Sequence, residues 1–154
     1  MSLVYHPMRE EEKVIVCNWT YSGNYAIYNL PSYEEMKQKG WAFANPNREK
    51  NFLVYYDRNV LTGFTNILEK EDEVFIGIGV SPELCGKGYG QKILKIAKEI
   101  SNELYPGKPM CLEVRSWNKR AISCYEKAGF VIEGNEFEQK TTIGVGKFYK
   151  MICE

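Results

Sequence analysis

The sequence has little of what a metal site or a disulfide framework requires. It contains a single histidine, His6, and five cysteines, an odd number, with no Cys-x-x-Cys pair among them. Zinc sites take several closely spaced Cys or His ligands, and disulfide frameworks use cysteines in pairs. We therefore expect no metal site and free thiols, which suit a reducing cytoplasm.

Long apolar runs and net charge are missing too. No stretch approaches the roughly 20 apolar residues of a membrane span, and no secretory signal is visible at the N-terminus. Twenty basic residues balance twenty acidic ones, whereas gripping nucleic acid through the overall field needs a net basic surface. These absences predict a cytoplasmic protein with neither a membrane nor nucleic acid as its partner.

The chain has the composition of one ordinary globular domain, because 44% of its 154 residues are hydrophobic and 26% are charged. No linker, repeat or low-complexity tract divides it. Apolar periodicity, caps and turn residues predict its elements. The local signals include Ser32 as an N-cap, Arg58-Asn59 as a two-residue hairpin turn, Gly129 as a helix stop and a loose, glycine-bearing connection at 141–146. In chain order they are strand 3–7, helix 9–21, a helix between Ser32 and Gly40, strands 51–57, 60–69 and 73–80, helix 88–105, strand 110–115, helix 118–128, and strands 130–138 and 147–153. This order predicts an α/β domain with a mixed sheet and helices on both faces.

A glycine-rich turn joins the buried strand 73–80 to the long helix that follows. Gly86, Gly88 and Gly90 alternate with Lys87 and Tyr89. Glycines let the backbone turn tightly, and the helix N-terminus adds unpaired N–H groups, so the turn can cradle a diphosphate. Within strand 73–80, Gly77 and Gly79 mark a bulge or a close backbone approach. The alternative is a plain strand-to-helix turn.

A second constellation lies on the strand–helix pair at 110–128. Asn118, Ala121 and Tyr125, spaced three and four apart, share one face of the predicted helix, and Glu113 lies on the preceding strand. Each residue also has a structural interpretation: Asn118 as an N-cap, Tyr125 as a core aromatic and Glu113 as a solvated carboxylate.

Together these segments resemble the two coenzyme motifs of the GNAT N-acetyltransferase superfamily. The turn resembles the motif [QR]-x-x-G-x-[GA], with Cys85 where the family has Gln or Arg, and Asn118 to Phe130 resembles the second motif. Residues 112–130 are similar to bacterial ribosomal-protein N-terminal alanine acetyltransferases. The resemblance implies a GNAT fold over residues 1–154, with a twisted, mostly antiparallel sheet of six to seven strands, an acceptor-side part at 1–50 and a coenzyme-binding core at 51–154.

By this resemblance the co-substrate is acetyl-CoA and the reaction is direct acetyl transfer to a primary amine. The two central strands should separate to admit the thioester. Cys85 removes a basic side chain from the phosphate rim, so we expect weaker coenzyme affinity; a redox-sensitive thiol is the alternative. The coenzyme-binding residues would be Ile78, Gly79, Val80, Cys85, Gly86, Lys87, Gly88, Tyr89, Gly90, Gln91, Asn118, Ala121 and Tyr125.

The resemblance also implies the catalytic groups. Tyr125 would protonate the departing thiolate and Glu113 would act as base, with Glu73 or an ordered water as rivals. An aromatic loop would line the acceptor site, suited to a cation or an apolar side chain; the alternative is a packed surface loop. Its residues are Trp19, Tyr21, Tyr25, Tyr28 and Tyr33.

By the resemblance the acceptor would be a small-molecule amine, such as a polyamine, an aminoglycoside or an amino acid, or a peptide N-terminus, and a homodimer through the final hairpin is expected by analogy. Glu133, Glu136 and Glu138 in that hairpin are candidates for attracting a positive acceptor. Two other classes stay open on the same fold. One is a non-catalytic acyl-CoA-binding module, and the other is a protein-interaction domain.

Overall fold

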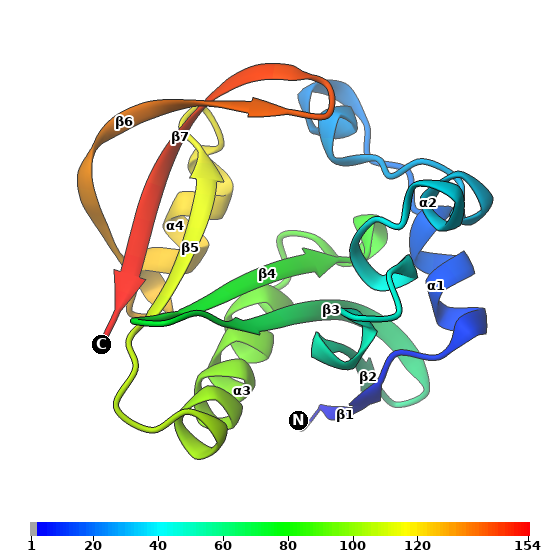
Figure 1. Cartoon of the computed structure of the whole chain (residues 1–154), viewed down its shortest axis with the longest axis horizontal. Helices are drawn as coiled ribbons and strands as arrows, with labels where there is room; N and C mark the ends of the chain where they lie inside the picture. The colour runs from blue at the N-terminus through cyan, green and yellow to red at the C-terminus, as the bar shows by residue number, and fades with distance from the viewer. Residues whose placement is uncertain (1–2) are drawn as a thin grey trace. The chain divides into compact units, whose positions relative to one another are not determined.

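The computed structural model describes residues 3–154 and has the predicted mixed architecture. The strands are hydrogen-bonded in the order β1-β2-β3-β4-β5-β7-β6 (Figure 1). The β4–β5 pair is parallel, whereas β1–β2, β2–β3, β5–β7 and β6–β7 are antiparallel. This confirms a mostly antiparallel sheet of the expected size. The bounds are β1 Val4–Pro7, α1 Glu10–Cys17, α2 Tyr33–Lys39, β2 Phe52–Asp57, β3 Val60–Glu69, β4 Val74–Val80, α3 Tyr89–Leu104, β5 Met110–Arg115, α4 Lys119–Lys127, β6 Val131–Thr141 and β7 Gly144–Cys153.

Several local predictions are confirmed by cap and turn geometry. Ser32 accepts a hydrogen bond from the backbone N–H of Glu35 at 3.2 Å, and Gly40 ends α2 in the left-handed conformation, φ 64°. Arg58 and Asn59 both have positive φ, 51° and 69°, as a two-residue hairpin turn requires. Local sequence therefore sets these junctions.

Two predicted boundaries are wrong. The first helix ends at Cys17 rather than near residue 21, and a 3₁₀ helix, Gly23–Tyr28, follows it. The final strands are longer than expected, because Thr141 pairs with Gly144 and Lys140 with Val145 across the hairpin. The glycines around residue 144 suggested a loose loop, but pairing with the opposite strand holds them in the ladder.

The chain divides into two compact units, which are described separately. The first comprises the residues up to Asn66 together with Ile78–Tyr89, and the second comprises Ile67–Gly77 and Gly90–Glu154. Strands β3 and β4 contribute residues to both units. The expectation of one domain over 1–154, subdivided after residue 50, stays a prediction.

The core of the first unit is aromatic. Phe43 meets Phe52 and Phe64 edge-on, at ring centroid distances of 5.5 and 6.1 Å. Such edge-to-face pairs add stability beyond the area that they bury. The other buried members of the cluster are Met8, Val16, Cys17, Met36 and Val54.

Two charged residues of α1 are buried in this unit, and both have partners. The Glu12 carboxylate accepts hydrogen bonds from the Arg9 backbone N–H at 2.8 Å and from the Tyr56 hydroxyl at 2.5 Å. The Lys13 ammonium lies 2.8 Å from a carboxylate oxygen of Glu49. Because a buried charge is tolerated only when it is paired, these contacts fix how α1 lies on β2.

In the second unit α4 lies beside β5 (Figure 1), and α3 approaches α4 closely at Gly90. Ile93, Leu94 and Ala97 of α3 are fully buried, whereas Leu104, the last residue of the helix, is 60% exposed. Gly129, φ 100°, follows α4, and the N–H groups of Gly129 and Phe130 donate to the carbonyls of Glu126 and Tyr125. This Schellman motif confirms the predicted glycine stop. Over residues 3–154 no helix is long and apolar enough to cross a membrane.

Gly79 illustrates a close backbone approach that the sequence predicted. A Cβ atom at this position would lie 2.3 Å from Cε1 of Phe64. Phe64 itself packs against Phe43 and Trp19. We expect Gly79→Ala to lower the free energy of unfolding by about 1–3 kcal/mol through overpacking, measured by urea denaturation.

The matched control is the same substitution in a Phe64→Leu background, which removes the clashing ring atoms. In that background Gly79→Ala should cost clearly less than it does alone. Equal costs in the two backgrounds would mean that the ring contact is not the reason for the glycine.

Candidate functional site

The turn between β4 and α3 has the backbone conformation that its glycines suggested. Gly86 and Gly88 have φ values of 80° and 86°, a region that other residues rarely adopt. Gly90 is helical, and a Cβ there would lie 2.8 Å from Sγ of Cys124 on α4. Two of the glycines therefore shape the turn, and the third permits a close approach of two helices.

Tyr89 anchors this turn to the hairpin of the first unit. Its hydroxyl donates to Oδ2 of Asp57 at 2.5 Å, and Asp57 is 8% exposed. Hydrogen bonding to the carboxylate raises the pKa of Tyr89 above its ordinary value. Tyr89 thus stays protonated at neutral pH as the donor that holds the first residue of α3.

The end of β4 is occupied by side chains of the same unit. The Tyr21 hydroxyl donates to the carbonyl oxygen of Val80 at 2.6 Å. The Cys85 thiol lies 3.5 Å from the Ser81 carbonyl oxygen and 3.9 Å from that of Val80. Cys85 therefore turns back onto the strand end. The Tyr21 contact was not predicted from the sequence, and nothing in local spacing signals it.

The five aromatic residues proposed as an acceptor wall are not alike. Trp19 packs on Phe64 at 6.1 Å, and Tyr33 packs on Phe43 at 6.5 Å, both as the edge of the aromatic core. The Tyr33 hydroxyl donates to Glu10 at 2.7 Å; burial, followed by this bond, raises its pKa to about 12. Tyr21, Tyr25 and Tyr28 are half-buried in the segment that contains the 3₁₀ helix.

In the second unit, strands β4 and β5 pair only at their beginnings. Val74 pairs with Met110 and Phe75 with Cys111, and within this unit no pairing of β4 with β5 extends beyond them over the described residues. Ile76 and Leu112 continue their strands unpaired with one another. The pairing is thus confined to the first two residues of β4, and the expected separation of the two central strands stays a prediction.

The predicted second constellation lies on α4. Asn118 is the N-cap, and its Oδ1 accepts a hydrogen bond from the backbone N–H of Ala121 at 3.1 Å. Asn118 is buried, at 6% exposed, whereas Ala121 and Tyr125 are half-buried. The cap interpretation of Asn118 is confirmed.

The two candidate bases differ in their surroundings. Glu113, on β5 beyond the last β4–β5 pair, is exposed and accepts a hydrogen bond from Nε2 of Gln139 at 3.1 Å. Glu73, just before β4, is held by Lys150 at 2.9 Å. That hydrogen bond is the main reason the pKa of Glu73 lies below its ordinary value, with a further hydrogen bond from Cys111. Glu73 is consequently a weaker base and is already engaged.

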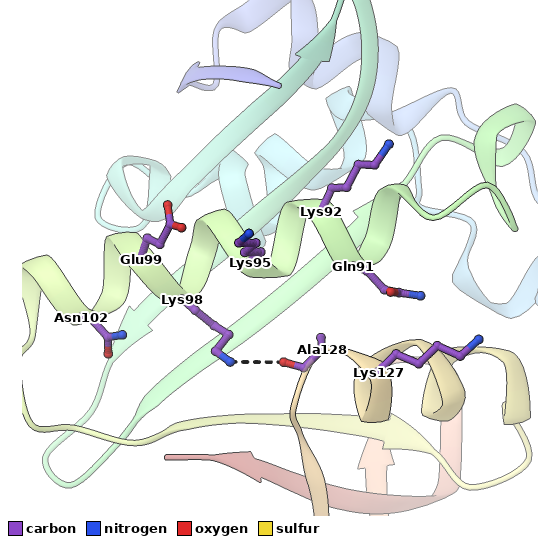
Figure 2. Close-up of a pocket in the computed structure, with 8 residues that line it drawn as sticks. All are labelled: Gln91, Lys92, Lys95, Lys98, Glu99, Asn102, Lys127 and Ala128. Carbon is purple, nitrogen blue, oxygen red and sulfur yellow. Dashed lines mark hydrogen bonds between the residues drawn. The ribbon is translucent and has the colours of Figure 1, made fainter. Parts of the chain in front are cut away.

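A lysine-lined groove of about 540 Å³ runs along α3 in the second unit. Figure 2 shows Gln91 and Lys98 reaching toward the C-terminal end of α4, where Lys98 donates to the carbonyl oxygen of Ala128 at 3.2 Å. This groove was not predicted from the sequence, although the spacing of lysines three apart on a helix could have revealed it. Its lining residues are Gln91, Lys92, Lys95, Lys98, Glu99, Asn102, Lys127 and Ala128.

Comparison with known sequences gives one family. The sequence profile described as the acetyltransferase (GNAT) family matches residues 14–130. A Bacillus subtilis protein named uncharacterized N-acetyltransferase YfmK is 28% identical over 103 residues, which is 62% of this chain and 64% of that protein. Spermidine N(1)-acetyltransferase of Vibrio cholerae is 26% identical over 111 residues, 70% of this chain and 64% of the relative. Each match thus spans less than two thirds of the relative's own length.

Solved structures share the fold. Spermidine N-acetyltransferase from Vibrio cholerae in complex with CoA and spermine is 20% identical, with a TM-score of 0.78 over 97% of this chain and 94% of that one. The ribosomal-protein-S18-alanine N-acetyltransferase from Escherichia coli is 16% identical, with a TM-score of 0.68 over 99% and 93%. At such identities the likeness concerns the fold alone.

Proposed function

Because this chain belongs to the acetyltransferase (GNAT) family, we propose that it transfers an acetyl group from acetyl-CoA to a primary amine by direct attack in a ternary complex. The observation that carries the proposal is the turn at the start of α3, where Gly86 and Gly88 adopt positive φ. Such a turn at a helix N-terminus presents backbone N–H groups to a diphosphate.

The family resemblance assigns two sets of residues to coenzyme binding. In the first unit, backbone groups of Ile78–Val80 would pair with the pantetheine arm, and residues 85–89 would bind the pyrophosphate. In the second unit, Gly90 and Gln91 extend the row of amides, and Asn118, Ala121 and Tyr125 would contact the arm and sulfur. A Cys85 thiol that contacts the strand end is consistent with backbone amides, rather than a side chain at this position, supplying the binding.

The chemistry needs a base and an acid. A base removes a proton from the ammonium form of the acceptor, and the neutral amine attacks the thioester carbonyl. Backbone N–H groups near Val80 would stabilise the oxyanion. The C–S bond then breaks, the thiolate takes a proton from Tyr125, and the resulting tyrosinate takes the second proton from the amide nitrogen, which restores Tyr125. The products are an amide and free CoA.

We assign the base to Glu113 rather than to Glu73. Glu113 lies beyond the last β4–β5 pair and is exposed, whereas Glu73 lies before the first pair, in an ion pair with Lys150. A carboxylate that is already hydrogen-bonded by an ammonium has a low pKa and accepts another proton poorly. An ordered water remains the alternative.

The first acceptors to try are polyamines, because one relative is named a spermidine N(1)-acetyltransferase. Carboxylates of the final hairpin would attract such a cation, although Glu133 already lies 3.7 Å from Lys150. A peptide N-terminus is the second acceptor class. The sequence similarity of residues 112–130 to the alanine acetyltransferases favours it.

Calorimetry with acetyl-CoA, followed by an amine panel with a thiol-release assay, tests the proposal. The panel holds spermidine, an alanine-initiated peptide and simple alkylamines, and desulfo-CoA serves as the binding control. We expect binding and amine-dependent thiol release. Binding without release from any amine would favour the non-catalytic module, and absence of binding at millimolar coenzyme would favour the interaction domain.

The lysine groove yields a prediction about coenzyme affinity. We propose that Lys95 and Lys127 attract the phosphates of the coenzyme's nucleotide end. Because exposed ion pairs contribute roughly 0.2–1 kcal/mol each, the double variant Lys95→Ala/Lys127→Ala should bind acetyl-CoA about three- to tenfold more weakly at low salt.

The difference in coenzyme affinity between the double variant and wild type should shrink as salt is added, and also when 3′-dephospho-CoA is the ligand. Lys140→Ala, which removes an exposed lysine from β6, is the matched control and should bind normally. Equal losses in the double variant and the control would leave the groove no role in coenzyme binding.

A further inference from the structure

The segment from Tyr21 to Asn29 in the first unit is closed on itself by one side chain. Oδ1 of Asn29 accepts a hydrogen bond from the backbone N–H of Tyr21 at 2.6 Å, and its Nδ2 donates to the Tyr21 carbonyl at 3.5 Å. Inside the segment, the N–H of Tyr25 donates to Ser22 and that of Asn29 to Ala26. The two ends of the segment therefore meet. We call this segment, residues 21–29, the tyrosine loop.

The closed loop is fastened to the rest of the unit at the last residue of β4. The Tyr21 hydroxyl reaches 59 positions along the chain to the carbonyl oxygen of Val80, at 2.6 Å. A carbonyl has two lone pairs, so Val80 can accept this bond and one more. The neighbouring residue Ser81 is itself fixed, because its N–H donates to Thr62 at 2.8 Å. Tyr21 is thus bonded to a rigid strand end.

The tyrosine loop carries no charged side chain of its own. No Asp, Glu, Lys or Arg occurs between Lys13 and Glu34, although 26% of the chain is charged. The loop also contributes no buried residue to the core. Its position therefore depends on hydrogen bonds and partial packing, among which the bond from Tyr21 to Val80 connects the loop to β4.

We infer that Tyr21 is a positioning residue that, together with Asn29, sets the place of the tyrosine loop and thereby the affinity for the acceptor. The inference rests on the proposed function, in which Val80 lies on the coenzyme strand, and on the expectation that the aromatic loop lines the acceptor site. Tyr21 acts through the loop and not on the reacting atoms. Loss of its hydroxyl should therefore change acceptor binding while leaving the chemical step intact.

Amide hydrogen exchange tests whether the bond from Tyr21 to Val80 holds the tyrosine loop in place, and it does so independently of catalysis. Tyr21→Phe should speed exchange at the amides of Tyr21, Tyr25 and Asn29 at least severalfold, and Asn29→Ala should do the same. Tyr5→Phe, which removes an exposed hydroxyl from the same unit, is the control and should leave these amides unchanged. Unchanged exchange in Tyr21→Phe would overturn the inference even if the enzyme proved active.

Steady-state kinetics tests the consequence. We expect Tyr21→Phe to raise the acceptor KM about three- to tenfold, the size of one net hydrogen bond, with kcat and the coenzyme Kd within twofold of wild type. Adding Asn29→Ala should raise the acceptor KM little further, because both residues hold the same loop. Multiplicative effects, or a loss confined to kcat, would contradict a shared positioning role. A wild-type protein that releases no thiol would instead defeat the proposed function and leave the exchange result standing.

Discussion

Tyr125→Phe should lower kcat for acetyl transfer about 100-fold, the lower end of the range for losing a general acid. The lower end applies because a thiol, with an ordinary pKa near 8.5, is a fair leaving group even without a proton donor. The coenzyme Kd should change less than threefold, since the ring that contacts the arm remains. Thiol-release assays measure kcat, and calorimetry on the same preparation measures the coenzyme Kd.

The control is Tyr105→Phe, which removes a half-buried hydroxyl just beyond α3 in the same unit. It should retain wild-type kcat. If Tyr125→Phe also kept wild-type kcat, Tyr125 would be a packing residue and water would protonate the thiolate. If it instead abolished coenzyme binding, its role would be in the binding site and not in the chemical step.

The parts of the fold that the sequence predicted are those that a few neighbouring residues determine. The Ser32 cap, the Arg58-Asn59 turn and the Gly129 stop each depend on contacts within about six residues, and each is confirmed. The length of the final hairpin was missed, because it depends on which strand lies opposite. The glycines near residue 144 do not indicate which strand pairs with this segment.

The candidate site divides in the same way. The conformation of Gly86 and Gly88 could be predicted, since glycine is the residue that adopts positive φ without strain. The bond from Tyr21 to Val80 and the pairing of Glu73 with Lys150 join residues 59 and 77 positions apart. No periodicity reports such contacts, and the second of them places Glu73 in an ion pair with Lys150.

The ion pair between Glu73 and Lys150 gives Glu73→Gln an expected effect on stability rather than on activity. The bond from Lys150 lowers the pKa of Glu73 in the folded protein, so Glu73 stabilises the fold above its unfolded pKa, and this contribution is lost as the pH falls through the lower folded value. Glu73→Gln should therefore lower the Tm at neutral pH and cease to matter in strong acid. Its kcat/KM near pH 7 should stay within threefold of wild type.

Glu113→Gln should instead lower activity and leave stability nearly unchanged. An amide cannot take the proton of the ammonium acceptor, so kcat/KM at neutral pH should fall about 100-fold or more. The acidic limb of the pH profile of kcat/KM should shift or vanish, because the group whose ionisation produced it is gone. The Tm should change little, since Glu113 is exposed and Gln can still bond Gln139. Measuring the pH profile of kcat/KM and the melting curve of both variants assigns the base. If the acidic limb survives in Glu113→Gln and disappears in Glu73→Gln, the base is Glu73. If the limb survives in both variants, the base is water.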